Sequence, residues 1–162
     1  MRIGVLSDTH IPTRAQEIPA GILAEFKKVD MIIHAGDLVD LTVLEKLKSA
    51  CANVKAVRGN MDSEEIKALL PEKEIIKIAD YRVGVMHGYG KPGGLIDFLT
   101  AAFKKDAVDM IVFGHSHSGF NEKINGIIFF NPGSATDKIC SPYNSYGIIE
   151  INDKIEAKII RI

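Results

Sequence analysis

The order of apolar segments along the chain is the feature that most constrains its fold. In the first half, segments of strand length alternate with segments whose apolar residues recur at helical spacing, such as Val43, Leu44 and Leu47. The expected strands are Arg2–Leu6, Asp30–Ala35 and Val54–Arg58, and the expected helices are Pro19–Lys28, Leu41–Ala50 and Ser63–Leu70. This alternation predicts an α/β fold in which helices cover a parallel sheet.

The second half of the chain adds antiparallel hairpins. Asn125-Gly126 is the strongest short hairpin signal, and Asn152-Asp153 is a second turn suited to positive φ. One helix is expected at Gly94–Lys105, and the expected strands are Glu74–Ala79, Arg82–Met86, Met110–Phe113, Gly119–Ile124, Ile127–Asn131, Tyr146–Ile151 and Lys154–Ile160. We therefore expect two sheets packed face to face with helices outside, in a single domain over residues 1–162.

Composition excludes several classes of protein. The 162 residues carry a formal net charge of −1, so no electrostatic footprint indicates a nucleic-acid or membrane partner. No segment approaches the ~20 apolar residues that span a bilayer, and the first apolar run is too short for a signal peptide. Cys51 and Cys140 lie far apart and are expected to be reduced thiols. We expect a soluble cytoplasmic protein.

Polar side chains with metal-binding groups follow five of the predicted strands directly. They are Asp8, His10, Asp37, Asn60, His87, His115 and His117. The carboxyl ends of parallel strands meet at one edge of a sheet, which is where ligands bind in α/β proteins. We therefore expect these side chains to form one site.

Histidine and glycine usage supports this expectation. Four of the five histidines lie in these loops, and the fifth, His34, is expected to be a half-buried strand residue. A glycine adjoins a ligand-type residue in four of the loops, at Gly36, Gly59, Gly88 and Gly114. Glycine tolerates positive φ and close backbone approach, so sharp turns are expected there.

The seven side chains define the chemistry of the predicted site. Two carboxylates, an amide oxygen and four imidazoles suit Mn, Fe, Zn, Ni or Co, and they exceed what one metal with an open position needs. Two metal ions ~3.5–4 Å apart that share a carboxylate can lower the pKa of a water and clamp a phosphate. The sequence therefore predicts a two-metal phosphoesterase.

The motifs Asp8-Thr9-His10, Gly36-Asp37, Gly59-Asn60, His87-Gly88 and Gly114-His115-Ser116-His117 resemble those of the calcineurin-like metallophosphoesterases. Asn131-Pro132-Gly133-Ser134 is similar to a motif of the small YfcE-like phosphodiesterases. The resemblance implies a four-layer α/β/β/α sandwich of two mixed sheets and attack on phosphorus by a metal-bridging hydroxide. It also implies two divalent ions, Mn first and Ni, Fe, Co or Zn as alternatives. One ion would take Asp8, His10, Asp37 and His117, and the other Asp37, Asn60, His87 and His115, with Asp37, Asn60 and His87 acting in catalysis.

One departure from the family pattern concerns proton donation. Many members of the family have a histidine after the Gly-Asn pair, often as general acid, whereas this chain has Met61. Methionine cannot donate a proton, so we expect turnover to favour esters with acidic leaving groups. Asp62 is either a substitute acid or a cap of the following helix.

Other polar residues near the predicted site have two interpretations each. Arg58 either binds substrate phosphate, as Asn60 is also expected to do, or is a surface arginine. Asp40 either orients a ligand or caps a helix. Asn131 and Ser134 either have a role in the motif that the YfcE-like subgroup shares or are explained by the turn at Pro132-Gly133 alone.

The segment at residues 88–93 matches G-x-G-x-x-G. Pro92 removes one N–H from it, and it comes late in the chain, so a dinucleotide site is not expected. We expect the segment to form the rim of the metal site, where Tyr89 or Lys91 meets substrate.

Two other functions compete with hydrolysis of small phosphodiesters. A retromer subunit with this fold works as a protein-binding scaffold with a degraded metal site, whereas every ligand position here holds a ligand-type residue. A haloacid-dehalogenase-type phosphatase would need a second aspartate two residues after Asp8, where His10 stands. The sequence leaves a homodimer open and does not indicate a polynucleotide partner.

Overall fold

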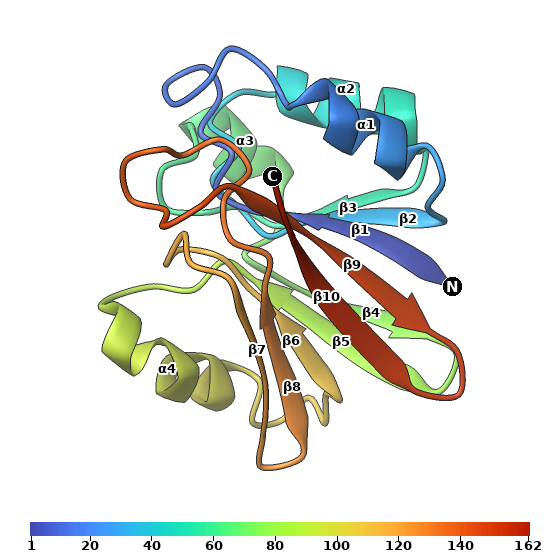
Figure 1. Cartoon of the computed structure of the whole chain (residues 1–162). Helices are drawn as coiled ribbons and strands as arrows, with labels where there is room; N and C mark the ends of the chain where they lie inside the picture. Colours follow the sequence, from blue (N-terminus) through green and yellow to red (C-terminus); the bar gives the residue numbers. More distant parts are fainter.

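The strands form two mixed five-stranded sheets that lie face to face (Figure 1). The structure is a computed structural model that describes residues 1–162. The first sheet has the strand order β10-β9-β1-β2-β3, and the second has the order β4-β5-β6-β8-β7. Parallel and antiparallel pairs occur in both sheets.

The first sheet is built from the two ends of the chain. Its strands are β1 (Arg2–Leu6), β2 (Met31–His34), β3 (Val54–Ala56), β9 (Ser145–Ile151) and β10 (Ile155–Arg161). The helices α1 (Ala20–Phe26), α2 (Thr42–Ala50) and α3 (Glu64–Leu69) follow β1, β2 and β3. The predicted β-α-β-α-β-α order is confirmed, with most element ends moved by one or two residues.

The second sheet is built from the middle of the chain. Its strands are β4 (Lys73–Ile78), β5 (Tyr81–Met86), β6 (Met110–Val112), β7 (Phe120–Ile124) and β8 (Ile127–Asn131). The 3-10 turn η1 (Pro92–Gly94) leads into α4 (Leu95–Ala102), which covers the outer face of this sheet. The predicted helix over Gly94–Lys105 is therefore three residues too long at its C-terminal end.

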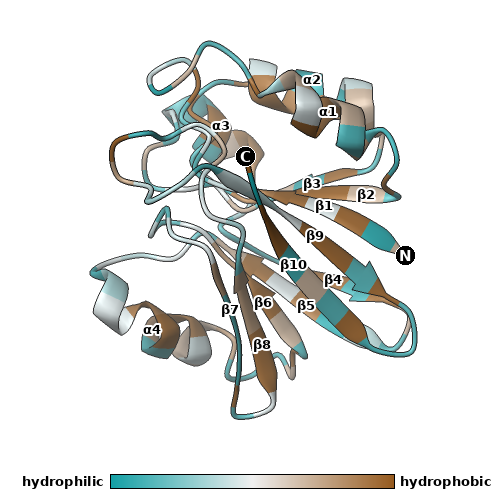
Figure 2. Ribbon diagram, in the orientation of Figure 1, coloured by the Kyte–Doolittle hydropathy of each residue, from teal (hydrophilic) through white to brown (hydrophobic).

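Three apolar clusters hold the layers together. Side chains such as Val5 and Phe130 fill the space between the sheets, Phe26 and Leu47 lie between the first sheet and α1–α3, and Leu99 lies under α4. Figure 2 shows the apolar residues running along the strands, while the loops are mostly polar. Three interfaces require four layers, so the predicted α/β/β/α sandwich of two mixed sheets is confirmed.

The two predicted hairpin turns have different outcomes. Asn125 (φ 50°) and Gly126 (φ 89°) connect β7 to β8 as predicted. Asn152-Asp153 lies between β9 and β10, but neither residue has positive φ, so that part of the prediction is wrong. Ile151 pairs with Ile155, which leaves a three-residue loop, and such loops need no two-residue turn of the primed type.

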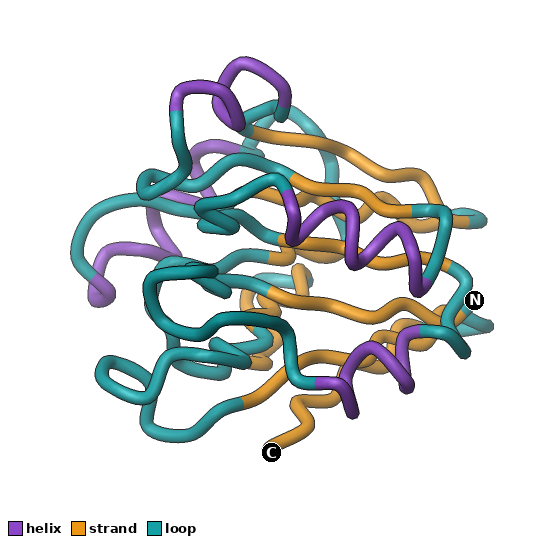
Figure 3. Tube along the Cα trace, turned by 90° about the horizontal axis from the view of Figure 1, so that it is seen from above, coloured by secondary structure: helices purple, strands orange, loops and turns teal.

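Most of the loop length lies at the end of the sandwich opposite the N-terminus (Figure 3). The loops after β1, β2, β3, β5 and β6 carry the predicted ligand-type residues. The fold therefore supplies one rim to which both sheets contribute.

Two glycines test the packing of α1 on the first sheet. A Cβ at Gly4 would lie 2.5 Å from Cε1 of Phe26, a fully buried ring, whereas a Cβ at Gly21 would meet nothing within 4 Å. We expect Gly4→Ala to lower the free energy of unfolding by about 1–3 kcal/mol through overpacking. The matched control Gly21→Ala should raise it by up to about 1 kcal/mol, because it favours the helix. Chemical denaturation measures both, and equal effects would contradict this packing.

Candidate metal centre

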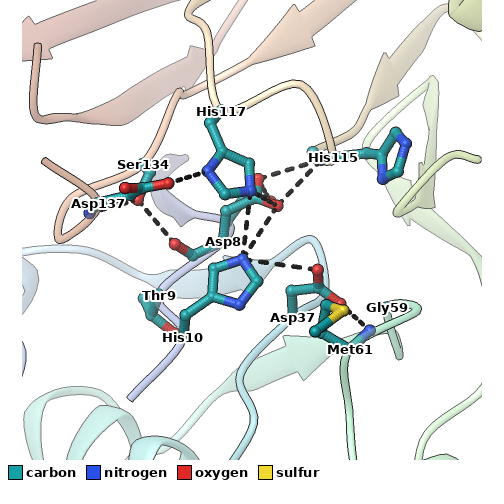
Figure 4. Close-up of polar contacts among 12 residues, drawn as sticks. Asp8, Thr9, His10, Asp37, Gly59, Met61, His115, His117, Ser134 and Asp137 are labelled. Carbon is teal, nitrogen blue, oxygen red and sulfur yellow. Dashed lines mark hydrogen bonds and ion pairs between the residues drawn. The ribbon is translucent and has the colours of Figure 1, made fainter. Parts of the chain in front are cut away.

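Two buried carboxylates lie at the centre of the rim and face three imidazoles. Oδ1 of Asp8 lies 3.9 Å from Nε2 of His10, 3.7 Å from Nε2 of His87 and 3.4 Å from Nε2 of His117. Oδ2 of Asp37 lies 3.6 Å from Nε2 of His10 and 3.3 Å from Nε2 of His87. Figure 4 shows Asp8, His10 and His117 pointing toward one another. Five of the seven predicted residues therefore form one cluster.

The other oxygens of these carboxylates accept fixed hydrogen bonds. Oδ1 of Asp37 accepts from the N–H of Met61 at 2.8 Å. Oδ2 of Asp8 accepts from the hydroxyl of Ser7 at 2.6 Å, and the N–H of His115 lies 3.1 Å from both Asp8 oxygens. These bonds aim Oδ1 of Asp8 and Oδ2 of Asp37 at the imidazoles.

Two of the imidazoles are held with Nε2 directed into the cluster. Nδ1 of His87 lies 2.7 Å from the carbonyl oxygen of Ala35, which can only accept, so Nδ1 carries the proton. Nδ1 of His117 donates to the Asp137 carboxylate in the same way. Nε2 of His87 is buried without a hydrogen-bond partner. A carbonyl or carboxylate behind the ring is the arrangement that orients metal-binding histidines.

The electrostatics of the cluster favour a cation. Burial by itself lowers the pKa of His87, but the neighbouring Asp37 and Asp8 carboxylates outweigh burial and raise that pKa to about 9. Burial lowers the pKa of His10 despite the same two carboxylates. A fully buried imidazole gains a proton only where the potential is strongly negative, so the cluster attracts positive charge.

Asn60 and His115 lie beside the cluster as a separate pair. Nε2 of His115 donates to the carbonyl oxygen of Gly90 at 2.7 Å, so Nδ1 keeps its lone pair and faces Oδ1 of Asn60 at 3.0 Å. The His115 and His87 rings lie edge to face with centroids 5.4 Å apart. Two acceptors that face each other, next to His87, suit a cation between or beside them.

The sharp turns at the rim are made largely by the ligand-type residues themselves. Positive φ occurs at five of the predicted residues, namely Asp8 (53°), His10 (44°), Asp37 (58°), His115 (71°) and His117 (56°). Such angles are uncommon outside glycine and collect at functional sites. The sequence analysis expected the neighbouring glycines to make these turns. Gly36 and Gly88 do have positive φ, but the five ligand-type residues have it as well.

Two neighbouring glycines serve by their size. Gly59 does not have positive φ, and a Cβ there would overlap Oδ1 of Asp37. A Cβ at Gly114 would overlap the hydroxyl oxygen of Ser7. The expectation of positive φ is wrong for these two glycines, whereas the expected close approach of the loops is observed and is what requires them.

Sequence reasoning missed Asp137. This fully buried carboxylate contacts Nδ1 of His117 and accepts from the N–H groups of Ile139 (2.8 Å) and Cys140 (3.1 Å). Burial raises its pKa, but those N–H groups and His117 outweigh burial and lower the pKa to about 2. Asp137 follows Ser134 in the loop after β8, so its place at another strand end was the available signal.

The turn that contains Asn131 and Ser134 supports the site loops. Nδ2 of Asn131 donates to the carbonyl oxygen of Gly114 at 2.9 Å, and the Ser134 hydroxyl donates to the carbonyl oxygen of Asp8 at 2.7 Å. Both side chains are buried. The turn geometry predicted for them is therefore incomplete, since they also fix the backbone beside Asp8 and His115.

Asp62 does not cap the following helix. Ser63 is the N-cap of α3, because its hydroxyl accepts from the N–H of Ile66 at 3.3 Å. The buried Asp62 carboxylate instead accepts from the N–H groups of Asp37 (3.1 Å), Val39 (2.7 Å) and Gly59 (2.7 Å). This ties the loop after β2 to the loop after β3. Because three backbone N–H groups occupy both oxygens of this carboxylate, Asp62 is not arranged to donate a proton to a leaving group.

His34 is fully buried rather than half-buried. Its Nε2 lies 3.1 Å from the Thr9 hydroxyl, and burial lowers its pKa to about 3.

The Asp40 carboxylate accepts from the N–H of Thr42 at 2.8 Å. Of the two interpretations of Asp40, the role at the start of the helix is therefore the one observed.

Two pockets open onto the centre. The first, the site pocket, has a volume of about 440 Å³ and is lined by His10, Asp37, His115 and His117 together with Arg14 and Met61. The second, the side pocket, has a volume of about 340 Å³ and is lined by Asn60 and His87 together with Arg58, Glu72, Tyr89 and Phe98. Asn60 lines both pockets. Arg14 is a further residue that sequence reasoning missed.

The donor set fits divalent metal ions. The ligand atoms of Asp8, His10 and His117 lie within 4.8 Å of one another, and so do those of Asp8, Asp37 and His87. Carboxylate and imidazole ligands suit transition metals of intermediate softness.

None of the helices is both long and apolar enough to cross a membrane.

Known proteins resemble this chain over its full length. Residues 1–154 match the calcineurin-like phosphoesterase superfamily domain. A probable metallophosphoesterase of Methanocaldococcus jannaschii is 43% identical, over 100% of this chain and 82% of that protein. A phosphodiesterase of the same organism is 29% identical, over 82% of this chain and 83% of that protein.

A solved structure of wild-type Vps29 from Entamoeba histolytica in complex with zinc has the same fold. It is 26% identical with a TM-score of 0.81, over 99% of each chain. The match to the family and the relatives that carry its name agree with the geometry of the rim. The chain belongs to the calcineurin-like phosphoesterase superfamily and is a hydrolase of phosphoester bonds.

Proposed function

We propose that this protein is a phosphodiesterase whose centre holds two divalent metal ions. The observation that carries the proposal is the position of Oδ2 of Asp37, which lies 3.6 Å from Nε2 of His10 and 3.3 Å from Nε2 of His87. A carboxylate oxygen that faces ligands on both sides suits a bridge between two ions. The phosphodiesterase of M. jannaschii, which shares the family, supports the diester as substrate.

Each ion has four proposed ligands. Asp8, His10, Asp37 and His117 would hold the first, and Asp37, Asn60, His87 and His115 would hold the second. The contacts among Asp8, His10 and His117 support the first set, and the Asn60–His115 pair beside His87 supports the second. When bound, the ions supply an activated water and neutralise phosphate charge. We propose Mn, with Ni, Fe, Co or Zn as alternatives, because the ligands are nitrogen and oxygen.

Arg14 is the residue that we propose contacts the phosphate in the site pocket. Its side chain is 34% exposed, and its Nε lies 4.0 Å from Oδ1 of Asp137, which keeps the guanidinium at the pocket wall. A guanidinium matches two phosphate oxygens at once. Arg58 is already bonded to the carbonyl oxygen of Lys67 and to Glu72, so its guanidinium has fewer free donors for phosphate.

The leaving group has no evident proton donor in the site pocket. Met61 is 60% exposed and lines this pocket at the position where relatives in the family often have histidine. Asp62 lies behind it with its carboxylate occupied. A departing alkoxide therefore has to take its proton from solvent, which favours acidic leaving groups.

A protein-binding scaffold with this fold is the alternative function. The likeness to Vps29 establishes the shared fold and does not separate a scaffold from an enzyme. The complete set of ligand-type residues supports the enzyme, because a scaffold has no need for strained backbone at five of them.

The wider setting of the protein follows the same reasoning. We propose that residues 1–162 form one metallophosphoesterase domain, supported by the family match to residues 1–154. We propose a cytoplasmic location, supported by the two free cysteines, Cys51 and Cys140.

Asp37→Asn should abolish metal-dependent hydrolysis. The change keeps the size of the side chain but removes the charge that two ions would share, so kcat for bis(4-nitrophenyl) phosphate with Mn²⁺ should fall more than about 100-fold. Asp40→Asn is the matched control, since that side chain three residues later contacts only the start of α2. Circular dichroism should show both variants folded. Activity near the wild-type level in Asp37→Asn would contradict the proposed role.

Met61→His should help only substrates with poor leaving groups. A histidine at this exposed position supplies a proton donor, and such donors contribute about 10²–10⁴-fold. We therefore expect at least about a tenfold gain on alkyl diesters and little change on nitrophenyl diesters. Met61→Gln is the control of similar length. The proposal is contradicted if the wild-type protein hydrolyses alkyl and aryl diesters at equal rates.

Asp137→Asn should weaken metal binding without unfolding the protein. The single amide oxygen can accept either from Nδ1 of His117 or from the N–H groups of Ile139 and Cys140, and the amide no longer supplies the negative charge that makes this imidazole a strong ligand. Mn²⁺ affinity measured by isothermal titration calorimetry should fall about tenfold. Asp153→Asn, in the β9–β10 loop, is the control. Equal affinities in the two variants would show that Asp137 does not act through His117.

A further inference from the structure

The side pocket contains the exposed aromatic side chains of this protein. Among the large hydrophobic residues that are exposed, only Tyr89 (68%) and Phe98 (36%) are aromatic, and both line this pocket. Tyr89 comes from the loop after β5, and Phe98 comes from the exposed side of α4. Aromatic surface left open to water in a pocket is available to bind an apolar or aromatic group.

The side pocket is continuous with the proposed catalytic centre. Asn60 and His87 line it, and both belong to the set of proposed metal ligands. A group bound against Tyr89 and Phe98 can therefore belong to the same molecule as a phosphate at the centre. The volume of about 340 Å³ lies at the lower end of the range of small-molecule sites, so it suits one ring system with its sugar.

Polar groups in the side pocket distinguish between kinds of aromatic ligand. Arg58 is fixed there by bonds to the carbonyl oxygen of Lys67 (2.9 Å) and to Oε2 of Glu72 (3.1 Å). Its guanidinium offers donors and a flat cationic face, and the Glu72 carboxylate offers acceptors. A ring with donors and acceptors on its edge can use the N–H groups and the carboxylate oxygen that these bonds leave free, whereas a plain hydrocarbon ring cannot.

The two pockets are suited to the two ester groups of a diester. The site pocket has a single hydrophobic residue, Met61, together with Arg14, and it is where the leaving group lacks a proton donor. The side pocket has three hydrophobic residues, Met86, Tyr89 and Phe98. The apolar ring of a substrate therefore belongs in the side pocket, with the ester group that stays on phosphorus.

We propose that the side pocket binds the nucleobase of a nucleoside phosphodiester, with Tyr89 and Phe98 as the specificity-determining residues. This inference rests on the proposed function. One water adds a hydroxyl group to phosphorus and the P–O bond to the leaving group breaks. The leaving group becomes an alcohol by taking a proton from solvent, which balances the proton that the attacking water releases. The product that remains is a nucleoside monophosphate with its base in the side pocket.

Product binding tests this proposal without turnover. The Mn²⁺-loaded protein is titrated calorimetrically with AMP and with ribose 5-phosphate, which share the sugar phosphate and differ in the base. We expect AMP to bind at least about tenfold more tightly, as alanine substitution studies of base–aromatic stacking imply. Tyr89→Ala and Phe98→Ala should each remove most of this preference and leave the affinity for ribose 5-phosphate unchanged. Leu69→Ala, an exposed apolar residue away from both pockets, should keep it.

The outcomes separate this inference from the proposed function. Equal affinities for the two ligands in the wild-type protein, no binding of either, or equal losses for both ligands in the variants would overturn the side pocket as a base site. Hydrolysis of bis(4-nitrophenyl) phosphate is measured on the same samples. If the wild-type protein hydrolyses this diester but shows no preference for AMP, only the base site fails. A preference for AMP with no hydrolysis of any diester would leave the base site standing and overturn the proposed function.

Discussion

The burial of two carboxylates at the rim is the constraint on which the site depends. Asp8 and Asp37 are almost fully buried, and a buried charge is costly unless it is hydrogen-bonded and paired. Each carboxylate accepts an N–H from another loop, His115 for Asp8 and Met61 for Asp37. The same bonds that make the charges tolerable also fix where the loops lie. These bonds also fix the direction of Oδ1 of Asp8 and Oδ2 of Asp37, which face the imidazoles. The fold thereby prepares a site for cations.

A second group of buried polar residues transmits this constraint to the surrounding backbone. Asp62 gathers three N–H groups from two loops, and Ser134 holds the carbonyl oxygen of Asp8. The Asp137 carboxylate accepts from Nδ1 of His117 and so fixes the orientation of that ring. None of these three residues lines either pocket. They nevertheless determine the geometry of the residues that line the pockets. This explains why the loops can adopt strained angles and still be well defined.

The sequence predicted the elements and the ligand-type residues because both depend on local patterns. Strand-end positions are visible in a sequence once the strands are recognised, and so Asp8, Asp37 and His87 could be found. The partners of those residues could not, since Asp137 meets His117 only through the pairing of β8 with β6. The interpretation of Asp62 as a helix cap was wrong for a similar reason. A carboxylate before a helix looks like a helix cap in the sequence. Only the packing of two loops shows that the Asp62 oxygens accept hydrogen bonds from the backbone of the loop after β2.

The division of the ligand-type residues between the sheets has a thermodynamic consequence. Asp8 and His10 follow β1 in the first sheet, whereas His87 and His117 follow β5 and β6 in the second. A cation held by Asp8, His10 and His117 would cross-link positions about 100 residues apart, and closing so large a loop restricts the unfolded chain far more than the folded one. The ion would thus link the two sheets of the sandwich reversibly. Its loss loosens the two sheets from each other first at the rim, while the apolar layer between them still holds the opposite end together.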